Sequence, residues 1–367
     1  MKSIKEIKNL KGRVVLLRAD FNVPIKNEKV MDSFRILKTV PTIKELVKKG
    51  GRVLVVSHAG GDGEQSLLPM VKILRRSIPN VVFIPKTTMT KKEILSFPEK
   101  SVVVLENIRR EMGEIKNDLS FAKKLAGMAD IYVNDAFSVS HRAHASVLGL
   151  TRYLPCYAGL QMEEEIKNLS NAFNPKHPFL FILGGAKFET KLPLIKKFLK
   201  NADSLFVGGA LANQIFKEHG FEIGISLVEK ENFGLVSLCK NKKIKIPVDV
   251  LAVNSVGGKR NVLVENLAKD ESMIDIGKET TALLIEEVKK AKFILWNGPV
   301  GKFDAQTKKI LKAVADSSAI SVVGGGDTVE MISKMKIEKS FTFVSTGGGA
   351  TLKFLSKGVL PGIKALK

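Results

Sequence analysis

The residues that could do chemistry fall into two groups, one in each half of the chain. In the first half, polar side chains follow apolar runs, as in Arg18-Ala19-Asp20-Phe21-Asn22, Ser57-His58 and Glu106-Asn107-Ile108-Arg109. In the second half, glycine clusters such as Gly184-Gly185-Ala186-Lys187 and Gly208-Gly209 take these places. Arginine forks bind carboxylates and phosphates, and bare glycines let a phosphate approach free backbone N–H groups. The pattern therefore indicates one region for a small anion and another for a nucleotide.

The occurrence of glycine clusters at the ends of three apolar runs strengthens the prediction of a nucleotide-binding region. They are Gly184-Gly185, Gly324-Gly325-Gly326 and Gly347-Gly348-Gly349, and Lys187 and Lys191 lie four residues apart just after the first. Lysine acts as a point charge toward phosphate, and this spacing lets both lysines face one site on a helix. Neither the G-x-x-x-x-G-K-[ST] nor the G-x-G-x-x-G fingerprint occurs. Tight turns are the plain alternative for one cluster, but several clusters at several run ends favour phosphate binding.

Asp327 and Thr328 directly follow one glycine cluster. A carboxylate beside a phosphate cradle commonly holds Mg²⁺, often through water. The same residue types also favour helix capping, so spacing alone leaves both interpretations open.

The segment His141-Arg142-Ala143-His144 could supply a metal site or an anion site. A structural zinc ion takes four ligands, and no further ligand is evident beside the two histidines. Anion binding by His141 and Arg142 is therefore the better interpretation, with a structural role for His144. Because a guanidinium binds carboxylate and phosphate bidentately, the candidate clamps of the chain are Arg18, Arg35, Arg109 and Arg142.

The apolar pattern predicts a scaffold that would bring these run ends together. Short β-branched runs that are apolar on both faces are typical of central strands in a parallel sheet. They occupy residues 14–17, 53–56, 81–84, 102–105, 131–133, 179–183, 205–207, 248–253, 293–296, 320–323 and 341–344. Segments with helical spacing lie between many of them, including 33–49, 119–128, 191–199 and 278–290. Strand alternating with helix predicts an α/β fold with doubly wound sheets, which bind ligands beyond the carboxyl ends of their strands.

The length of the chain predicts two domains, because 367 residues exceed what one hydrophobic core usually serves. A boundary is expected near Leu154-Pro155-Cys156-Tyr157, before a segment of helical spacing over 160–170 that could act as a hinge. We therefore expect a first domain over 1–157 and a second over 158–350.

Composition favours a cytosolic protein with an anionic partner. The formal net charge is +22 and is dispersed along the chain, and the two cysteines form no C-x-x-C pair. No apolar run reaches the roughly 18 residues that span a bilayer, and the N-terminus lacks a signal-peptide core. Two other classes of function agree less well with the sequence. The missing G-x-G-x-x-G argues against an NAD-dependent dehydrogenase, and the dispersed charge argues against a nucleic-acid-binding protein.

Motifs along nearly the whole chain resemble those of the phosphoglycerate kinase family, in the family's order. The resemblance is carried by Arg18-Ala19-Asp20-Phe21-Asn22-Val23-Pro24, Ser57-His58, Glu106-Asn107-Ile108-Arg109, Asn134-Asp135-Ala136-Phe137, His141-Arg142-Ala143-His144, Gly184-Gly185-Ala186-Lys187, Trp296-Asn297-Gly298-Pro299, Gly324-Gly325-Gly326-Asp327-Thr328 and Ser345-Thr346-Gly347-Gly348-Gly349-Ala350. The resemblance implies two Rossmann-like domains with parallel sheets facing a cleft, joined by a hinge helix, in a molecule that is usually monomeric. It also implies that a C-terminal segment, about 351–367, returns to the first domain.

The resemblance assigns roles to individual residues of a phosphoryl transfer between 1,3-bisphosphoglycerate and ADP that gives 3-phosphoglycerate and ATP. The phosphoglycerate-binding set it implies is Asp20, Phe21, Asn22, Arg35, Ser57, His58, Arg109, His141 and Arg142. The nucleotide-binding set it implies is Gly185, Lys187, Lys191, Gly208, Gly209, Asn297, Pro299, Asp304, Gly325, Gly326, Asp327 and Thr328, with Mg²⁺ on Asp327. The residues implied to surround the transferring phosphoryl group are Arg35, Lys191, Gly347, Gly348 and Gly349.

The chain departs from the family pattern at a few positions. The family's S-H-L-G-R-P is here Ser57-His58-Ala59-Gly60-Gly61-Asp62, so Gly61 replaces an arginine that would help hold the substrate's non-transferred phosphate. Arg110 replaces an aromatic residue beside the proposed clamp Arg109 and is the nearest candidate in sequence to compensate. Asp304 replaces a glutamate, and the family's K-V-x-D-K is here Lys187-Phe188-Glu189-Thr190-Lys191.

Overall fold

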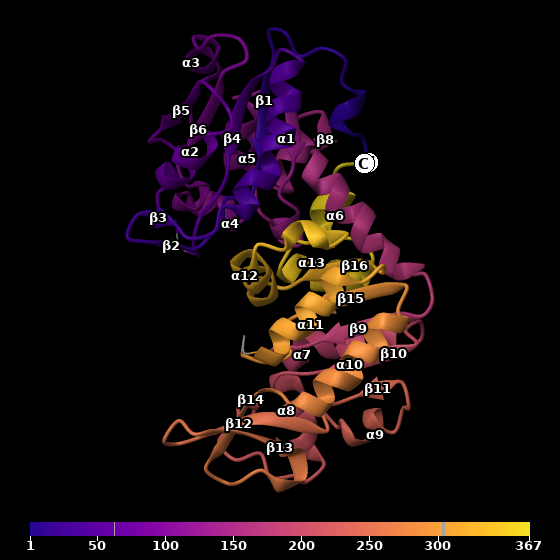
Figure 1. Ribbon diagram of the computed structural model, residues 1–367. Helices are drawn as coiled ribbons and strands as arrows, with labels where there is room; N and C mark the ends of the chain where they lie inside the picture. The colour runs from indigo at the N-terminus through magenta and orange to yellow at the C-terminus, as the bar shows by residue number, and fades with distance from the viewer. Residues whose placement is uncertain (62, 303–304) are drawn as a thin grey trace. The chain divides into compact units, whose positions relative to one another are not determined.

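The structure is a computed structural model that describes residues 1–61, 63–302 and 305–367 (Figure 1). The described residues form two compact units, the first made of Met1–Lys167 and Lys357–Lys367 and the second of Asn168–Ser356. Each unit contains a six-stranded sheet whose neighbouring strands all pair in parallel. The predicted fold class, two α/β units built on parallel sheets, is confirmed. The sequence predicts divisions after 157 and 350, and the units divide after Lys167 and Ser356.

The sheet of the first unit has the strand order β5-β6-β4-β1-β7-β8. Its strands are β1 (Val14–Arg18), β4 (Arg52–Val56), β5 (Val81–Ile84), β6 (Val102–Leu105), β7 (Ile131–Asn134) and β8 (Cys156–Ala158). Every residue of β1, β6 and β7 is buried, as expected for strands covered by helices on both faces. A separate two-stranded ribbon is formed by β2 (Ile25–Lys26) and β3 (Lys29–Val30).

The helices of the first unit are α1 (Phe34–Lys48), α2 (Leu68–Leu74), α3 (Lys91–Leu95), α4 (Met112–Ile115), α5 (Leu119–Ala126) and α6 (Leu160–Ser170), whose last residues extend into the second unit. Three of them, α1, α5 and α6, match the segments 33–49, 119–128 and 160–170 that were predicted from helical spacing. Helix α1 buries Ile36, Ile43 and Leu46, which recur on one face of the helix. Helix α5 begins where the Asp118 carboxylate accepts a hydrogen bond from Phe121 N at 2.8 Å.

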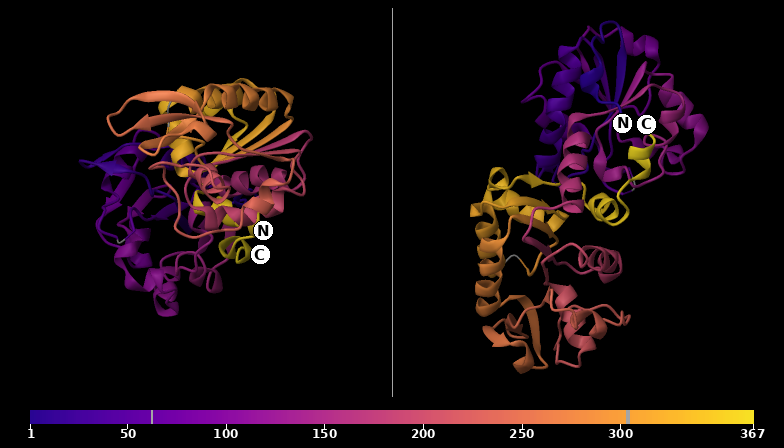
Figure 2. Two further views of the ribbon diagram at one scale, coloured as in Figure 1. Left: turned by 90° about the horizontal axis from the view of Figure 1, so that it is seen from below. Right: turned by 90° about the vertical axis from the view of Figure 1, so that its right-hand side faces the viewer.

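Both chain termini lie in the first unit and close to each other in both views of Figure 2. Near the N-terminus, Ser3 forms a parallel bridge with Ala158 of β8. In the C-terminal segment, α14 (Pro361–Lys364) is fixed by a hydrogen bond from Gly362 N to Ser140 O at 2.8 Å, and Leu360 and Leu366 are buried. The structure thus shows residues 357–367 within the first unit.

The sheet of the second unit has the order β11-β10-β9-β15-β16-β17. Its strands are β9 (Phe179–Leu183), β10 (Ser204–Val207), β11 (Ile244–Lys245), β15 (Phe293–Asn297), β16 (Ile320–Gly324) and β17 (Phe343–Val344). Strand order along the chain reverses between β9 and β15. In open parallel sheets, the carboxyl ends of the strands at such a reversal flank the ligand crevice.

Residues 248–253 were predicted as a central strand of a parallel sheet, and this prediction is wrong. The segment forms β12 (Asp249–Asn254), which pairs antiparallel with β13 (Lys259–Leu263) and β14 (Glu271–Ile276) in a separate sheet. The reason is that β12 is only partly buried and its partner β13 is mostly exposed, as in an antiparallel sheet with one face toward water. Apolar composition alone did not distinguish this half-covered strand from a central one.

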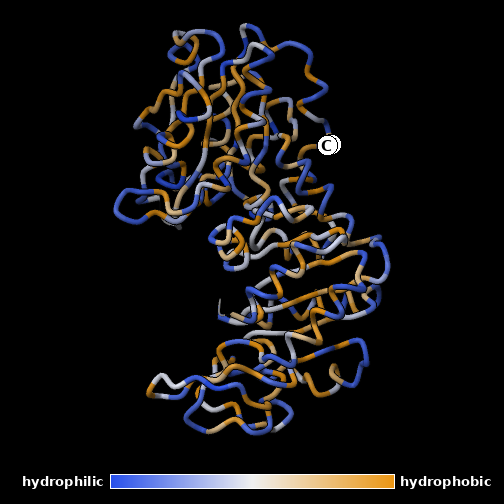
Figure 3. Tube along the Cα trace, in the orientation of Figure 1, coloured by the Kyte–Doolittle hydropathy of each residue, from blue (hydrophilic) through white to orange (hydrophobic). Residues whose placement is uncertain are grey.

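The second unit has helices on both faces of its parallel sheet. They are α7 (Phe188–Phe198), α8 (Ala210–Glu218), α9 (Val236–Cys239), α10 (Lys278–Lys290), α11 (Ala305–Asp316), α12 (Gly326–Met335) and α13 (Gly349–Lys357). Helices α10 and α11 lie on one face, and α7 and α8 on the other (Figures 1 and 2). Figure 3 shows hydrophobic residues along the strands within each unit and hydrophilic residues along many loops. Within the described residues, every helix is too short or too polar to cross a membrane.

Candidate functional site

The loop after β1 brings together three of the predicted anion-site residues. Asn22 N donates to the Asp20 carboxylate at 3.1 Å, and Arg35 Nη1 lies 3.4 Å from the same carboxylate and 3.2 Å from Asn22 O. The Asn22 side chain accepts from Gly60 N at 3.0 Å, so it also ties this loop to the one after β4. Arg35, at the start of α1, is held on one side by these acceptors while its side chain stays partly exposed.

The residues after β4 are placed behind this loop. Ser57 Oγ accepts from Phe21 N at 3.0 Å and donates to Ala19 O at 2.8 Å, which fixes the backbone around the buried Phe21. His58 is buried, and its Nδ1 lies 3.3 Å from Arg18 Nη2. Burial, followed by the charges of Arg18 and Arg109, lowers the pKa of His58 well below its ordinary value. The imidazole is therefore neutral near pH 7.

Arg109 lies in the same cluster of charge. Its Nη1 donates to the carbonyl oxygens of Gly60 and, at 3.5 Å, Gly61. Burial, and after it the charges of Arg142 and Arg18, lowers the pKa of Arg109 to about 10. An arginine whose charge is destabilised by its surroundings gains free energy when an anion binds beside it. Arg142 is exposed, and its charge acts on both Arg109 and His58.

Arg18 does not occupy the position expected of a clamp. The structure shows its side chain fully buried, with Nε donating to Ser146 Oγ at 2.8 Å and Nη1 to Ala19 O at 2.7 Å. Its guanidinium is thus used inside the unit, where it can act on a ligand only through its charge and through His58. The sequence did not indicate this burial, because Arg18 is followed by polar residues just as an exposed residue at a strand end would be.

Glu114 is a residue of this cluster that sequence analysis missed. The carboxylate is fully buried and accepts from Ser146 N at 2.8 Å and Ser146 Oγ at 2.6 Å, with His144 Nδ1 at 3.6 Å and Arg18 Nη2 at 4.0 Å. Burial by itself would raise the pKa of Glu114, but the nearby His144 imidazole and the charge of Arg18 bring the pKa below its ordinary value. The structural role predicted for His144 agrees with this contact. The neighbours of Glu114 in sequence, including Glu111 and Lys116, are ordinary charged residues, so nothing in the local sequence distinguished Glu114.

In the second unit, the loops after β9 and β15 lie against each other at the reversal of strand order. Gly184 N donates to Asn297 O at 3.0 Å, and Gly185 N donates to Pro299 O at 2.8 Å. Lys191, on α7, reaches back so that its ammonium donates to Gly184 O. A Cβ at Gly298, where φ is +85°, would lie 2.7 Å from Lys191 Nζ. These glycines are therefore needed because backbone and ammonium approach so closely.

Lys191 and Lys187 differ in environment although they lie only four residues apart. Lys191 is 7% exposed, whereas Lys187 precedes the first residue of α7 and is exposed. Burial lowers the pKa of Lys191 to about 8, and the charge of Asp327 opposes this shift. Asp327 lies in the first turn of α12, so the structure brings these two candidates within electrostatic range.

Four helices of this unit begin just after strands of the parallel sheet. Gly209 precedes α8 and Gly325 precedes α12, and both have positive φ. The glycine-rich segment 347–349 leads into α13, with Ser345 Oγ accepting from Gly347 N at 3.2 Å and lying 2.8 Å from Thr351 Oγ1. Amides in the first turn of a helix have no intrahelical acceptor and attract anions. The predicted glycine clusters thus lie at helix N-termini.

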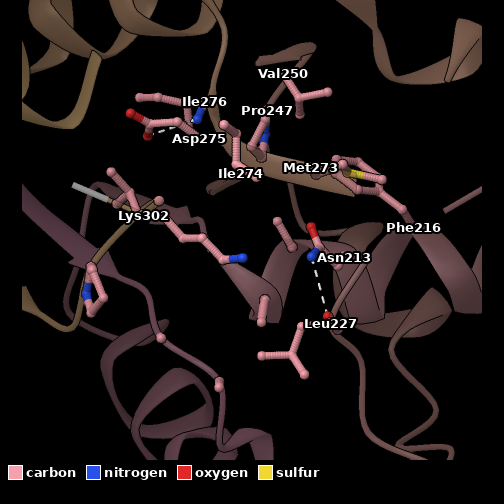
Figure 4. Close-up of a pocket in the computed structure, with 18 of the residues that line it drawn as sticks. Asn213, Phe216, Leu227, Pro247, Val250, Met273, Ile274, Asp275, Ile276 and Lys302 are labelled. Atoms are coloured by element: carbon pink, nitrogen blue, oxygen red, sulfur yellow. Dashed lines mark hydrogen bonds between the residues drawn. The ribbon is translucent and has the colours of Figure 1, made fainter. Parts of the chain in front are cut away.

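A cavity of about 160 Å³ opens beside these helix starts (Figure 4). Four predicted residues line it: Gly185, Gly209, Pro299 and Asp327. Sequence analysis missed its largely apolar wall, formed by Phe216, Leu227, Val250, Met273, Ile274, Ile276 and Val300. Figure 4 shows the Lys302 side chain extending into the cavity, and Asn213 donating to Leu227 O at 3.2 Å. The wall comes from α8, β12, β14 and the loops that contain Leu227 and Val300, which are far apart in sequence, so no motif could have revealed it.

Two predicted polar side chains near these loops are buried without an acceptor or donor among the described residues. They are Asn297, through Nδ2, and Thr328, through Oγ1. Buried polar groups are normally paired, so such atoms indicate room for a ligand. Asp304 lies outside the described residues.

The described residues fit a magnesium ion that is bound mainly by substrate phosphates and water and only partly by the protein. They contain no group of three or more metal-ligating His, Cys, Asp or Glu side chains. Asp327 instead offers one exposed carboxylate at the cavity wall. Mg²⁺ is typically held by one or two carboxylates together with substrate phosphates and water.

Comparison with known proteins decides the family. The family described as phosphoglycerate kinase matches residues 4–357. The chain belongs to the phosphoglycerate kinase family. Members of this family are kinases, so the chain is an enzyme of the phosphotransferase class. Neither a dehydrogenase nor a nucleic-acid-binding protein is supported.

Relatives of this kinase match it along almost the whole chain. The phosphoglycerate kinase of Dictyoglomus turgidum is 39% identical, covering 98% of this chain and 96% of the relative, and that of Clostridium tetani is 37% identical, covering 100% and 97%. Among solved structures, the phosphoglycerate kinase of Pyrococcus horikoshii aligns with a TM-score of 0.88 at 31% identity, covering 100% of this chain and 98% of the relative. The enzyme from Coxiella burnetii aligns with a TM-score of 0.84 at 33% identity, covering 99% and 98%.

Proposed function

We propose that this kinase transfers a phosphoryl group reversibly between the acyl phosphate of 1,3-bisphosphoglycerate and ADP, giving 3-phosphoglycerate and ATP. The observation that carries the proposal is the position of Lys191. Its ammonium lies where β9 and β15 end and the strand order reverses, beside glycines that let it approach the backbone closely. A buried cation at a crevice of this kind suits a phosphoryl group in transfer.

The first unit supplies the phosphoglycerate site in this proposal. Its clustered arginines, with the neutral His58 and the amide of Asn22, would bind the carboxylate, hydroxyl and phosphate of that substrate. The residues assigned to it are Asp20, Phe21, Asn22, Arg35, Ser57, His58, Arg109, His141 and Arg142. The destabilised charge of Arg109 supports this assignment, since a bound anion would stabilise it.

The second unit supplies the nucleotide site. The largely apolar cavity would take the base, and the N-termini of the neighbouring helices would take the phosphates. The assigned residues are Gly185, Lys187, Lys191, Gly208, Gly209, Asn297, Pro299, Asp304, Gly325, Gly326, Asp327 and Thr328. Asp327 would hold Mg²⁺ together with the nucleotide phosphates. When bound, the ion would neutralise charge on these phosphates.

Phosphoryl transfer needs alignment and charge neutralisation rather than a protein nucleophile. Arg35, Lys191 and the amides of 347–349 would surround the transferring group. Since the two sets of residues belong to different units, we propose that the units close on their substrates about a hinge near α6. Closure would exclude the water that hydrolyses an acyl phosphate.

The same proposal includes a monomeric, cytoplasmic enzyme without a nucleic-acid or membrane partner. Cys156 and Cys239 are free thiols in the structure, which fits a reducing compartment. A coupled assay with 3-phosphoglycerate and MgATP tests the whole proposal. Folded protein that binds nucleotide but turns over in neither direction, with Mg²⁺ or Mn²⁺, would show that the assigned reaction is wrong.

A further inference from the structure

The chain crosses between its two units twice, and both crossings lie near one lysine. It leaves the first unit after Lys167 and returns to it after Ser356. Soon after the first crossing comes the short helix Asn171–Phe173, and the second crossing falls within the last turn of α13. Lys197, near the end of α7, contacts the chain beside each crossing.

The contacts of Lys197 are specific for a cation. Its Nζ donates to Leu355 O at 2.7 Å and to Ser356 O at 3.1 Å, and it lies 4.4 Å from the centre of the Phe173 ring. The last carbonyl groups of a helix have no intrahelical donor and carry the negative end of its dipole. The face of an aromatic ring also attracts a cation. One ammonium thus satisfies the end of α13 and holds the segment that follows the first crossing.

The surroundings of this ammonium are partly closed to water. The Phe173 ring also packs on Phe354 of α13, with ring centres 5.7 Å apart. Partial burial lowers the pKa of Lys197 from its ordinary value. By contrast, Lys196, the preceding residue of the same helix, is exposed.

The two helices joined by Lys197 both carry groups assigned to phosphoryl transfer. Lys191 lies six residues earlier on α7, which is about 9 Å along the helix axis. Helix α13 begins at Gly349, directly after Gly347 and Gly348. A shift of α13 along or away from α7 would therefore change the distance between the Lys191 ammonium and the amides of 347–349.

We propose that Lys197 is a positioning residue, which fixes α13 against α7 and holds the chain beside both crossings to that pair of helices. This inference rests on the proposed function, because it assumes that Lys191 and 347–349 act on one phosphoryl group. Lys197 lies at the ends of the two helices opposite to these groups and need not touch a substrate. Its effect should therefore appear in the rate of transfer and not in nucleotide affinity.

The test compares Lys197→Met, Lys197→Arg and the control Lys196→Met in the full-length enzyme. Methionine keeps much of the apolar stem and removes the charge, whereas arginine can still donate to carbonyl groups and stack on the ring. We expect Lys197→Met to lower kcat about 10-fold with the KM for MgATP changed less than about twofold, since small misplacements have such effects. Lys197→Arg should restore most of the rate, and Lys196→Met should resemble the unmodified enzyme.

Hydrogen exchange provides a readout that does not depend on activity. Backbone amides of α13 should exchange faster in Lys197→Met than in Lys196→Met. Equal exchange and equal kcat in these two variants would overturn the inference. So would a loss of kcat that Lys197→Arg does not reverse, or one accompanied by a matching rise in KM. Failure of the proposed function would look different, because the unmodified enzyme itself would then lack turnover while the exchange difference persisted.

Discussion

The ammonium of Lys191 donates a hydrogen bond to the carbonyl oxygen of Gly184, the residue that directly follows strand β9. Among the described residues this hydrogen bond is what holds the ammonium, and burial lowers the pKa of Lys191 to about 8. A phosphate oxygen would be a stronger acceptor than this carbonyl. The lysine is thus held in place by a bond that a substrate can replace.

The pKa of Lys191 predicts a decline of activity in mild alkali. The kcat/KM for MgATP reports the free enzyme and should fall as pH rises through about 8, because the uncharged amine cannot neutralise phosphate. Lys191→Arg, which keeps its charge, should give a flatter profile at a lower rate. The measurement is kcat/KM between about pH 6.5 and 9.5. Identical profiles for both enzymes would exclude Lys191 as the titrating group.

The lowered pKa of Lys191 also predicts that stability rises with pH over a range in which activity falls. Lys191 has a folded-state pKa below its ordinary value of 10.5, so between about 8 and 10.5 the unfolded chain binds more protons than the folded one. Its contribution to stability should therefore rise with pH in this window. Thermal unfolding of Lys191→Met, compared with the unmodified enzyme at both ends of the window, checks the sign. A larger gain on substitution at the alkaline end would contradict it.

Arg35 and Lys191 should act mainly on the transition state. Replacing either by alanine should lower kcat by roughly 10²–10³, because one preorganised charge contact is typically worth that much. Lys44→Ala, on the exposed face of the helix that carries Arg35, is a matched control and should leave kcat unchanged. Steady-state kinetics decide the matter. An unchanged kcat with a raised KM would show that the residue binds substrate without assisting transfer.

Asp135 should make the enzyme less stable as pH rises toward neutrality. Its carboxylate accepts from Met162 N at 3.1 Å at the start of α6, and burial raises its pKa to about 7. Between about 4 and 7 the folded state then binds more protons than the unfolded chain, so stability falls with a slope of at most about 1.4 kcal/mol per pH unit.

The variant Asp135→Asn tests this prediction, because asparagine can accept the same bond without titrating. Its Tm should vary less with pH than that of the unmodified enzyme between about pH 4.5 and 7. Asp118→Asn is the control, since the pKa of that exposed carboxylate is lowered and its titration lies below this window. Equal pH dependence of Tm in the Asp135 variant and the unmodified enzyme would show that Asp135 is not responsible.

Gly61 should cost the enzyme affinity for 3-phosphoglycerate. A Cβ at this position would meet no heavy atom within 4 Å, so a side chain can leave the backbone here without a close contact. Gly61→Arg should lower the KM by about tenfold with kcat unchanged, because a contact to a non-reacting phosphate serves ground and transition states alike. Gln65→Arg adds the same charge to the same exposed loop and should have a smaller effect.

Arg110 is the alternative source of that missing charge. In the structure its Nε donates to Gly63 O at 3.1 Å, and its Nη1 lies 3.4 Å from the Glu106 carboxylate, so it holds the loop. If Arg110 also compensates for Gly61, Arg110→Phe should raise the KM and Gly61→Arg should then restore it. A KM that neither substitution moves would show that the family arginine has no counterpart here.

Closure of the two units should require both substrates. Sites on different units favour the closed state together more than either substrate does alone, so the radius of gyration should be smallest with 3-phosphoglycerate and nucleotide both bound. Small-angle scattering in the four ligation states measures this. Identical radii in all four would contradict the proposed closure.

The sequence by itself predicted the two parallel sheets and the strand ends that carry chemistry. Central strands such as β1 and β9 are apolar on both faces, and this pattern can be recognised from the strand's own residues. The helix predicted over 278–290 coincides with α10, because its apolar spacing is likewise local. Glycine clusters at strand ends marked the helix starts because glycine, which has no Cβ, readily adopts the positive φ found at Gly209 and Gly325.

Only the tertiary structure decided which side chains are available to a ligand. Arg18 and Arg35 were both predicted as anion clamps, yet Arg18, the last residue of β1, is fully buried, whereas Arg35, at the start of α1, is partly exposed. Glu114 was missed because Ser146, which donates to its carboxylate, is distant in sequence. The apolar cavity wall was missed because its residues, such as Phe216 and Met273, are distant from one another. Strand β12 was misassigned for the same reason. Burial and strand pairing depend on contacts between segments that are remote in sequence, and a local sequence pattern does not determine these contacts.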